Sequence, residues 1–262
     1  MPVIDLPSNL PEPISTRLEE QRPDVTPRSD FHRRLLYGEQ RMFRLQNDSM
    51  NLTPGNAQSD GDDRYVSVPD ELLDSGSYPV ELESELFTRS NNTLRLRPIR
   101  GDDADRLKAF HHQLSFDSVY RRYFSAHPEL SDDEVLHLTK VDYIDRLAFV
   151  IEDGDELVAV ARYDRYPFTT RAEVAFVIRD DYQHQGLGHL LLGALADAAW
   201  RRGITDLMAE TLFTNRDMMS VFRHSGFPMT TSIMGGEIAV RLSIEPTSES
   251  VARQFEYRSR TN

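Results

Sequence analysis

The sequence predicts a mixed α/β domain with a mostly antiparallel sheet and flanking helices, over residues 91–246. Three observations predict it. Apolar runs of strand length alternate there with segments whose apolar residues recur at helical spacing. Asp153-Gly154-Asp155 and Gly235-Gly236 are hairpin signals, which join antiparallel strands. One apolar strand is instead followed by a glycine turn and a helix, as in the crossover between parallel strands.

Length and composition bound the function. The 262 residues suffice for one domain plus an extension, or for two small domains. There is no cysteine, so any acyl transfer must be direct or use another nucleophile. A net charge of -13 argues against duplex nucleic acid or an anionic membrane as the main partner. Because no targeting segment and no long apolar run are visible, we expect a cytoplasmic protein.

Residues 1–90 have a different composition from the rest. Prolines are scattered through the first 27 residues, and between Asp60 and Glu85 nine acidic residues face one arginine. Such a segment buries too little apolar surface to offset its ordering entropy, so we expect an acidic, largely disordered extension. Residues 29–46 could form a basic amphipathic helix for a partner, or could pack on the chain's own domain.

The first half of the domain is predicted to contain a strand, a group of helices and a β-hairpin. Leu94–Ile99 alternates apolar residues with arginine before and around Pro98, which indicates a first strand near a sheet edge. Helical segments follow through Ala104–Leu114 and Val119–Phe124, and a capping box starts a third at Ser131. Leu147–Ile151 and Leu157–Tyr163 then form the predicted hairpin.

The central stretch places a strand, a glycine turn and a helix in succession. Ala172–Ile178 is an apolar run typical of a buried strand, interrupted by Glu173, a carboxylate that needs either a partner or a chemical role when buried. The turn contains Gly186 and Gly188, and a helix follows from Leu187 to Ala198. Free backbone N–H groups and the positive end of a helix dipole meet at such a turn, so it is a candidate phosphate site.

The remaining segments complete the sheet. We expect a strand over Asp206–Leu212, a short helix over Met218–His224, and two strands between Pro228 and Ile244. Residues 247–262 form a polar C-terminal tail that ends as a loose helix.

The order of these elements resembles the GCN5-related N-acetyltransferase (GNAT) family over roughly Leu94 to Ile244. Two motifs carry the resemblance: the turn from Gln183 to Gly188, similar to the family's pyrophosphate loop, and Asn215-Arg216-Asp217-Met218 leading to Gly226-Phe227. Shorter segments look like the bacterial Pat-type protein lysine acetyltransferases, which acetylate acyl-CoA synthetases; they are 94–100, 110–115, 123–125, 141–143, 161–163 and 172–177.

The resemblance implies an acetyl-CoA-dependent N-acetyltransferase with a GNAT-type sheet and a protein lysine as acceptor. It places the general base at Glu173, and an ion pair of Glu173 with Arg171 or Arg162 is the alternative. The residues that it assigns to acetyl-CoA are Val177, Ile178, Gln183, His184, Gln185, Gly186, Leu187, Gly188 and Asn215. A small-molecule amine acceptor and a non-catalytic acyl-CoA-sensing module remain as alternatives.

Two side-chain patterns qualify this prediction. Phe222 stands where many relatives carry a general-acid tyrosine, although a thiol with a pKa of about 8.5 leaves as a thiolate at pH 7 with a protonation deficit of only ~2 kcal/mol. No histidine pair has metal-binding spacing, and adjacent His111 and His112 would point about 100° apart on a helix. We therefore expect no metal.

Overall fold

The computed structural model describes residues 77–87, 93–126 and 129–261. The expectations of disorder for residues 1–76 and of an amphipathic helix over 29–46 fall outside these ranges. Among the described residues, no helix is both long enough and apolar enough to cross a membrane.

The described core is one mixed sheet of eight strands, in the order β1-β2-β3-β4-β5-β6-β8-β7. Every neighbouring pair is antiparallel except β5 and β6, which are parallel. The predicted fold class is therefore confirmed. The strands are β1 (Ser84–Phe87), β2 (Thr93–Pro98), β3 (Arg146–Asp153), β4 (Glu156–Arg165), β5 (Arg171–Ile178), β6 (Asp206–Leu212), β7 (Met229–Met234) and β8 (Glu237–Ser243).

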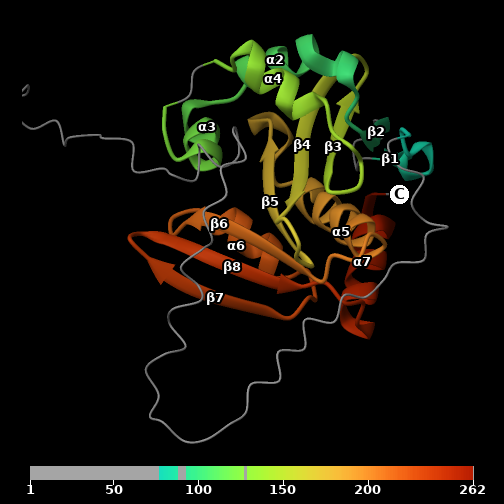
Figure 1. The fold of residues 1–262 in the computed structure, drawn as a ribbon, viewed down its shortest axis with the longest axis vertical. Helices are drawn as coiled ribbons and strands as arrows, with labels where there is room; N and C mark the ends of the chain where they lie inside the picture. Colours follow the sequence, from blue (N-terminus) through green and yellow to red (C-terminus); the bar gives the residue numbers. More distant parts are fainter. Residues whose placement is uncertain (1–76, 88–92, 127–128, 262) are drawn as a thin grey trace, which may run out of the picture.

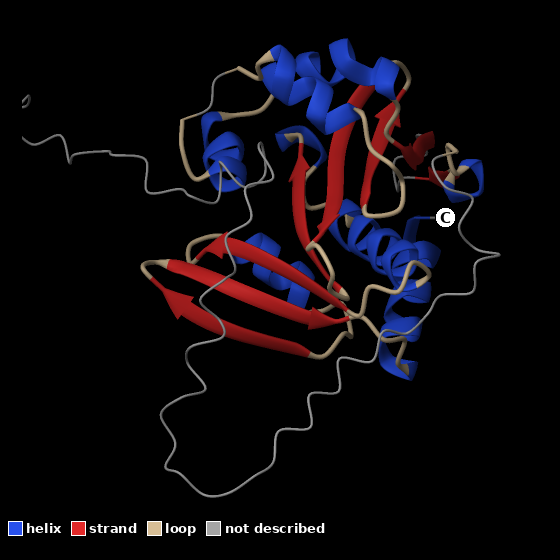
Figure 2. Cartoon of the chain, in the orientation of Figure 1, coloured by secondary structure: helices blue, strands red, loops and turns tan. Residues whose placement is uncertain are grey.

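Helices cover both faces of the sheet (Figure 2). One face packs on α2, α3 and α4 through a cluster that includes Leu107, Val119 and Val135. The other packs on α5, whose apolar residues include Leu191 and Leu195. The helices are α2 (Ala104–His112), α3 (Phe116–Tyr123), α4 (Asp132–Thr139), α5 (Leu187–Trp200), α6 (Arg216–Arg223) and α7 (Ser248–Thr261), with short 3-10 turns η4 (Val80–Leu82), η5 (Gly101–Asp103) and η6 (Asp180–Tyr182).

The sheet opens between its two central strands. β5 and β6 pair only where residues 171–173 lie beside residues 206–208. Beyond Glu173 the two strands diverge, so that β6, β8 and β7 turn away from the strands on the other side (Figure 1). Because β5 remains paired with β4 as far as Ile178, only its β6-facing edge is exposed by the opening.

The sheet starts earlier than the sequence indicated. β1 pairs with β2 in register, so β2 lies near the edge of the sheet, as predicted, but is its second strand, and the sheet includes residues before 91. Tyr78 also belongs to it, since its hydroxyl donates to Glu83 (2.6 Å) and to the carbonyl of Pro98. The composition of residues 60–85 concealed this strand, because a run rich in acidic residues directly precedes the short apolar pair Leu86-Phe87.

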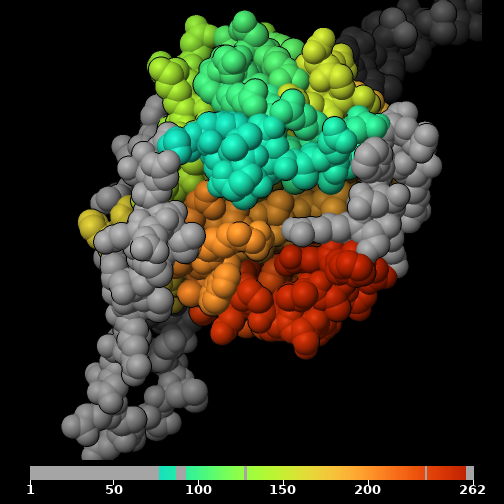
Figure 3. Space-filling view, turned by 90° about the vertical axis from the view of Figure 1, so that its right-hand side faces the viewer, coloured from blue at the N-terminus to red at the C-terminus, as the bar shows by residue number. Residues whose placement is uncertain are grey.

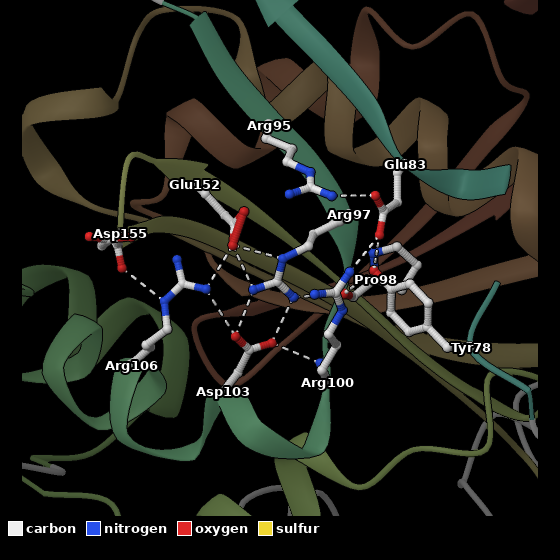
Figure 4. Close-up of polar contacts among 10 residues, drawn as sticks. All are labelled: Tyr78, Glu83, Arg95, Arg97, Pro98, Arg100, Asp103, Arg106, Glu152 and Asp155. Carbon is white, nitrogen blue, oxygen red and sulfur yellow. Dashed lines mark hydrogen bonds and ion pairs between the residues drawn. The ribbon is translucent and has the colours of Figure 1, made fainter. Parts of the chain in front are cut away.

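Next to β1, a group of four buried or partly buried charges ties β2 and β3 to the start of α2. We call Arg97, Asp103, Arg106 and Glu152 the Arg97 group (Figure 4). Arg97 is 2% exposed and forms a two-bond pair with Asp103 (2.6 and 2.7 Å) and a third bond with Glu152 (2.7 Å). Arg106 reaches both carboxylates. These hydrogen bonds hold the pKa values of both carboxyls below their usual range despite burial.

The C-terminal segment is a packed helix rather than a loose one. α7 lies beside α5 on the face shown in Figure 3. Ser250 is fully buried, and its hydroxyl and the Thr247 hydroxyl each accept from the other residue's backbone N–H. Gly226, at φ 79°, lets this turn approach closely, because a Cβ there would lie 2.9 Å from the Ser250 Cα. Both the positive φ angle and the close approach of Ser250 therefore favour glycine at position 226.

Candidate active site

A cavity of about 820 Å³ occupies the opening between β5 and β6. Its walls come from β5, the turn after β5, the start of α5, β6 and α6, with α3 across from them. Asp180 fixes α3 in place, because its carboxylate accepts from the backbone N–H of Ser115 and from the hydroxyls of Ser115 and Ser118. The cavity thus brings together segments that lie about a hundred residues apart.

The glycine turn presents unused backbone donors to this cavity. Residues 183–188 all line it. The backbone N–H groups of residues 184–188 donate to no acceptor among the described residues, and no side chain caps the start of α5. Gly186 is at φ 88° and His184 at φ 59°, both in the left-handed region. Adjacent free N–H groups at a helix start form a site for a phosphate or another anion.

The glutamine side chains of the turn brace it. Gln183 Nε2 donates to the Ile178 carbonyl (3.0 Å) and to the Ser118 hydroxyl (3.1 Å), and Gln185 Nε2 donates to the Asp181 carbonyl. A Cβ on Gly188 would lie 3.0 Å from Val221 Cγ2, so this glycine lets α5 and α6 pack closely. Gln183 and Gln185 therefore hold the shape of the turn with their side chains, while the backbone N–H groups of the turn remain available for a ligand.

The other predicted cofactor residues lie on the same cavity. Val177 and Ile178 line it from the unpaired edge of β5. Asn215 lines it from the start of α6, where its side-chain oxygen accepts from the Met218 N–H (3.1 Å) as a helix cap. An extended ligand with amide groups could add to the open edge of β5 as a strand does.

Glu173 is the last β5 residue that pairs with β6 before the two strands separate, and the cavity lining begins at the next residue, Val174. It is 8% exposed, and its Oε1 has no hydrogen-bond partner among the described residues. Burial, and next the charge of Asp164, raise the pKa of Glu173 to about 7. The alternative of an ion pair with Arg162 is not formed, because Arg162 donates to Asp164 instead (2.9 Å).

Sequence reasoning did not single out Arg122, which lines the cavity from α3. Its Nη1 is buried and has no hydrogen-bond partner among the described residues. Burial lowers the pKa of this guanidinium, and the charge of Glu173 opposes that shift. The available signal was its place on the helix, three residues after Val119, on the side that packs on the sheet. Arg121, its neighbour, instead reaches Asp217 on α6 (3.4 Å).

Comparisons with known proteins agree with this geometry. The model of the Acetyltransferase (GNAT) family matches residues 115–227. Acetyltransferase PA5475 of Pseudomonas aeruginosa is 32% identical over 136 residues, which are 50% of this chain and 73% of that protein. The chain therefore belongs to the GNAT family of acetyltransferases, whose acyl donor is acetyl-CoA.

Two further relatives place its domain with the Pat type. Acetyltransferase Pat of Mycolicibacterium smegmatis is 30% identical over 167 residues, 63% of this chain and 49% of that protein. The crystal structure of the GNAT domain of S. lividans PAT superposes with a TM-score of 0.60 at 35% identity, covering 64% of this chain and 99% of that one. The chain thus spans about half the length of the Mycolicibacterium relative.

Proposed function

We propose that this chain transfers the acetyl group of acetyl-CoA to the side-chain amine of a protein lysine. The observation that carries the proposal is the row of unused backbone N–H groups at residues 184–188, at one end of a cavity whose wall is an unpaired strand edge. The N–H groups suit the pyrophosphate of acetyl-CoA, and the edge of β5 suits the amides of its pantetheine arm. The thioester would then lie toward Glu173.

We assign Glu173 as the general base. A lysine amine has a pKa of about 10.4 and must lose a proton before it can attack. A carboxyl group with a pKa of about 7 accepts that proton more readily than an ordinary glutamate would, and Oε1 has no competing partner among the described residues. Glu173 is only 8% exposed, which also limits access of bulk water to its carboxyl group.

The reaction then proceeds by direct transfer. Glu173 takes the ammonium proton, the neutral amine nitrogen attacks the thioester carbonyl carbon, and the carbon–sulfur bond breaks to release the thiolate while the second proton of the nitrogen passes to solvent. Phe222 cannot protonate that thiolate; it is fully buried and lies edge-on to Phe176, with ring centroids 6.2 Å apart. A thiol with a pKa of about 8.5 leaves as a thiolate at pH 7 at a cost of only ~2 kcal/mol.

A protein acceptor is supported by the Pat-type likeness and by the surface of α3. Phe116 and Tyr120 are exposed on this helix and stack with ring centroids 6.1 Å apart. Arg121 of the same helix lines the cavity. Exposed aromatic side chains beside a binding cavity are typical of protein interaction sites rather than of sites for a small amine.

The test is incubation of the chain with radiolabelled acetyl-CoA and either a cell lysate or a panel of small amines. Label in protein that maps to lysine by mass spectrometry is the expected result. Label only in small amines would identify the alternative substrate class. Tight binding of acetyl-CoA without label in either fraction would contradict the enzymatic proposal and favour an acyl-CoA-sensing module.

A further inference from the structure

The end of the cavity beyond the glycine turn is built by elements outside the region that matches the family. Leu86 on β1 and Tyr257 on α7 both line it, together with His189 in the first turn of α5. The family match covers residues 115–227, so Leu86 and Tyr257 lie outside it. α7 contacts both α5 and β1, which closes this end.

Two of these side chains form a stacked pair. The rings of His189 and Tyr257 lie 4.0 Å apart between centroids, with an angle of 21° between their planes. The Nε2 atom of His189 is buried without a hydrogen-bond partner among the described residues. Burial lowers the pKa of His189, and the charge of His224, just after α6, acts in the same direction, which favours the neutral imidazole. The cavity therefore ends in flat, uncharged rings with one unused polar atom.

Flat rings beside an anion site match the chemistry of a nucleotide. A purine has two π-faces for stacking on aromatic rings, and its edge carries both donors and acceptors for a neutral imidazole nitrogen. The phosphates of the same nucleotide would lie at the free N–H groups of residues 184–188, which directly precede His189. Leu86, which is buried, provides an apolar surface next to the pair.

We propose that Tyr257 and His189 bind the adenine of the acyl donor, so that the C-terminal helix α7 completes the donor site. The inference rests on the proposed function, because it takes acetyl-CoA as the donor. It assigns α7 a role in selecting a nucleotide-bearing thioester over one that has only the pantetheine arm. α7 itself packs closely on α5, where a Cβ on Gly193 would lie 3.3 Å from Gln254.

The test compares two donors that differ only in the nucleotide. Calorimetry on the full chain would measure the affinity for acetyl-CoA and for S-acetyl-4′-phosphopantetheine, which lacks adenosine 3′,5′-bisphosphate. Tyr257→Ala should weaken acetyl-CoA binding about tenfold and change binding of the shorter thioester less than twofold. Tyr257→Phe keeps the ring and should bind both as the parent does. Phe255→Ala, at an exposed position on the same helix, is the matched control and should change neither affinity.

The possible results separate the inference from the proposed function. Unchanged acetyl-CoA affinity in Tyr257→Ala overturns the inference and leaves the donor assignment intact. An equal loss for both thioesters also overturns it, because Tyr257 would then act through the packing of α5; the same holds if Tyr257→Phe loses as much as Tyr257→Ala. A parent chain that binds neither thioester would overturn the proposed function itself, and the inference with it.

Discussion

Two groups of buried charges on the same sheet are arranged in opposite ways. In the Arg97 group each charge has partners of opposite sign at 2.6–3.1 Å. Near the opening between β5 and β6, Glu173 and Arg122 each keep a buried polar atom without a hydrogen-bond partner among the described residues. Buried charges that stabilise a fold are paired, since an unpaired one costs several kcal/mol. The comparison supports the proposal that the second group serves the reaction rather than the fold.

The largest expected effect is the loss of catalytic activity in Glu173→Gln, which tests the group near the opening. Glu173→Gln keeps the shape of the side chain but cannot accept a proton, so we expect kcat to fall by about 10² to 10⁴ with little change in acetyl-CoA affinity. Steady-state kinetics and calorimetry on the same preparation measure both quantities. A variant with full activity would refute the role of Glu173 as base.

The same variant tests whether the buried Glu173 carboxyl lowers the free energy of unfolding when it ionises. Burial raises its pKa from 4.5 to about 7, so the folded chain keeps a proton that the unfolded chain releases between these pH values. The stability of the parent should therefore fall as the pH rises from 4.5 to 7. The glutamine variant lacks this loss, and its stability relative to the parent should increase by about 3 kcal/mol across that window. Urea unfolding at pH 5 and pH 8 measures the difference; a gap between variant and parent that is the same at both pH values would contradict it.

For the Arg97 group the expected loss is in stability. Arg97→Met leaves Asp103 and Glu152 with only Arg106 as a cationic partner, so we expect the free energy of unfolding to fall by about 3 to 5 kcal/mol. Acetyl-CoA affinity below the melting temperature should not change. Arg95→Met is the control. Arg95 lies on the same strand as Arg97, but it is exposed and pairs with Glu83, so its loss should cost less than about 1 kcal/mol. Equal losses in the two variants would contradict the importance of burial here.

Strands, helices and the glycine turn were predictable because they depend on local patterns. The apolar run of Val, Ile and Phe after Glu173 predicted the strand, and the residues predicted to bind acetyl-CoA, from Val177 to Asn215, line one cavity. Pairing between distant residues was not predictable. Nothing local indicates that Tyr257 stacks on His189, because that contact depends on how α5 and α7 pack. The bond of Arg162 to Asp164 is local by contrast, since residues two apart on a strand share one face.

The smallest effect concerns Arg122, which shares the opening with Glu173. Four charged groups act on Glu173: Asp164 and Glu210 raise its pKa, while Arg122 and Arg162 lower it. Arg122→Met removes one of the cations, so the pKa of Glu173 should rise and less of it should be ionised at pH 7. We expect kcat/KM to be about three- to tenfold lower at pH 7 and to recover near pH 9, as the acidic limb of the pH profile moves upward. Arg121→Met removes the adjacent cation, which is directed toward Asp217, and should leave that limb in place. A uniform loss at every pH in Arg122→Met would show that Arg122 supports packing or substrate binding instead, and its unpaired Nη1 would then need another ligand.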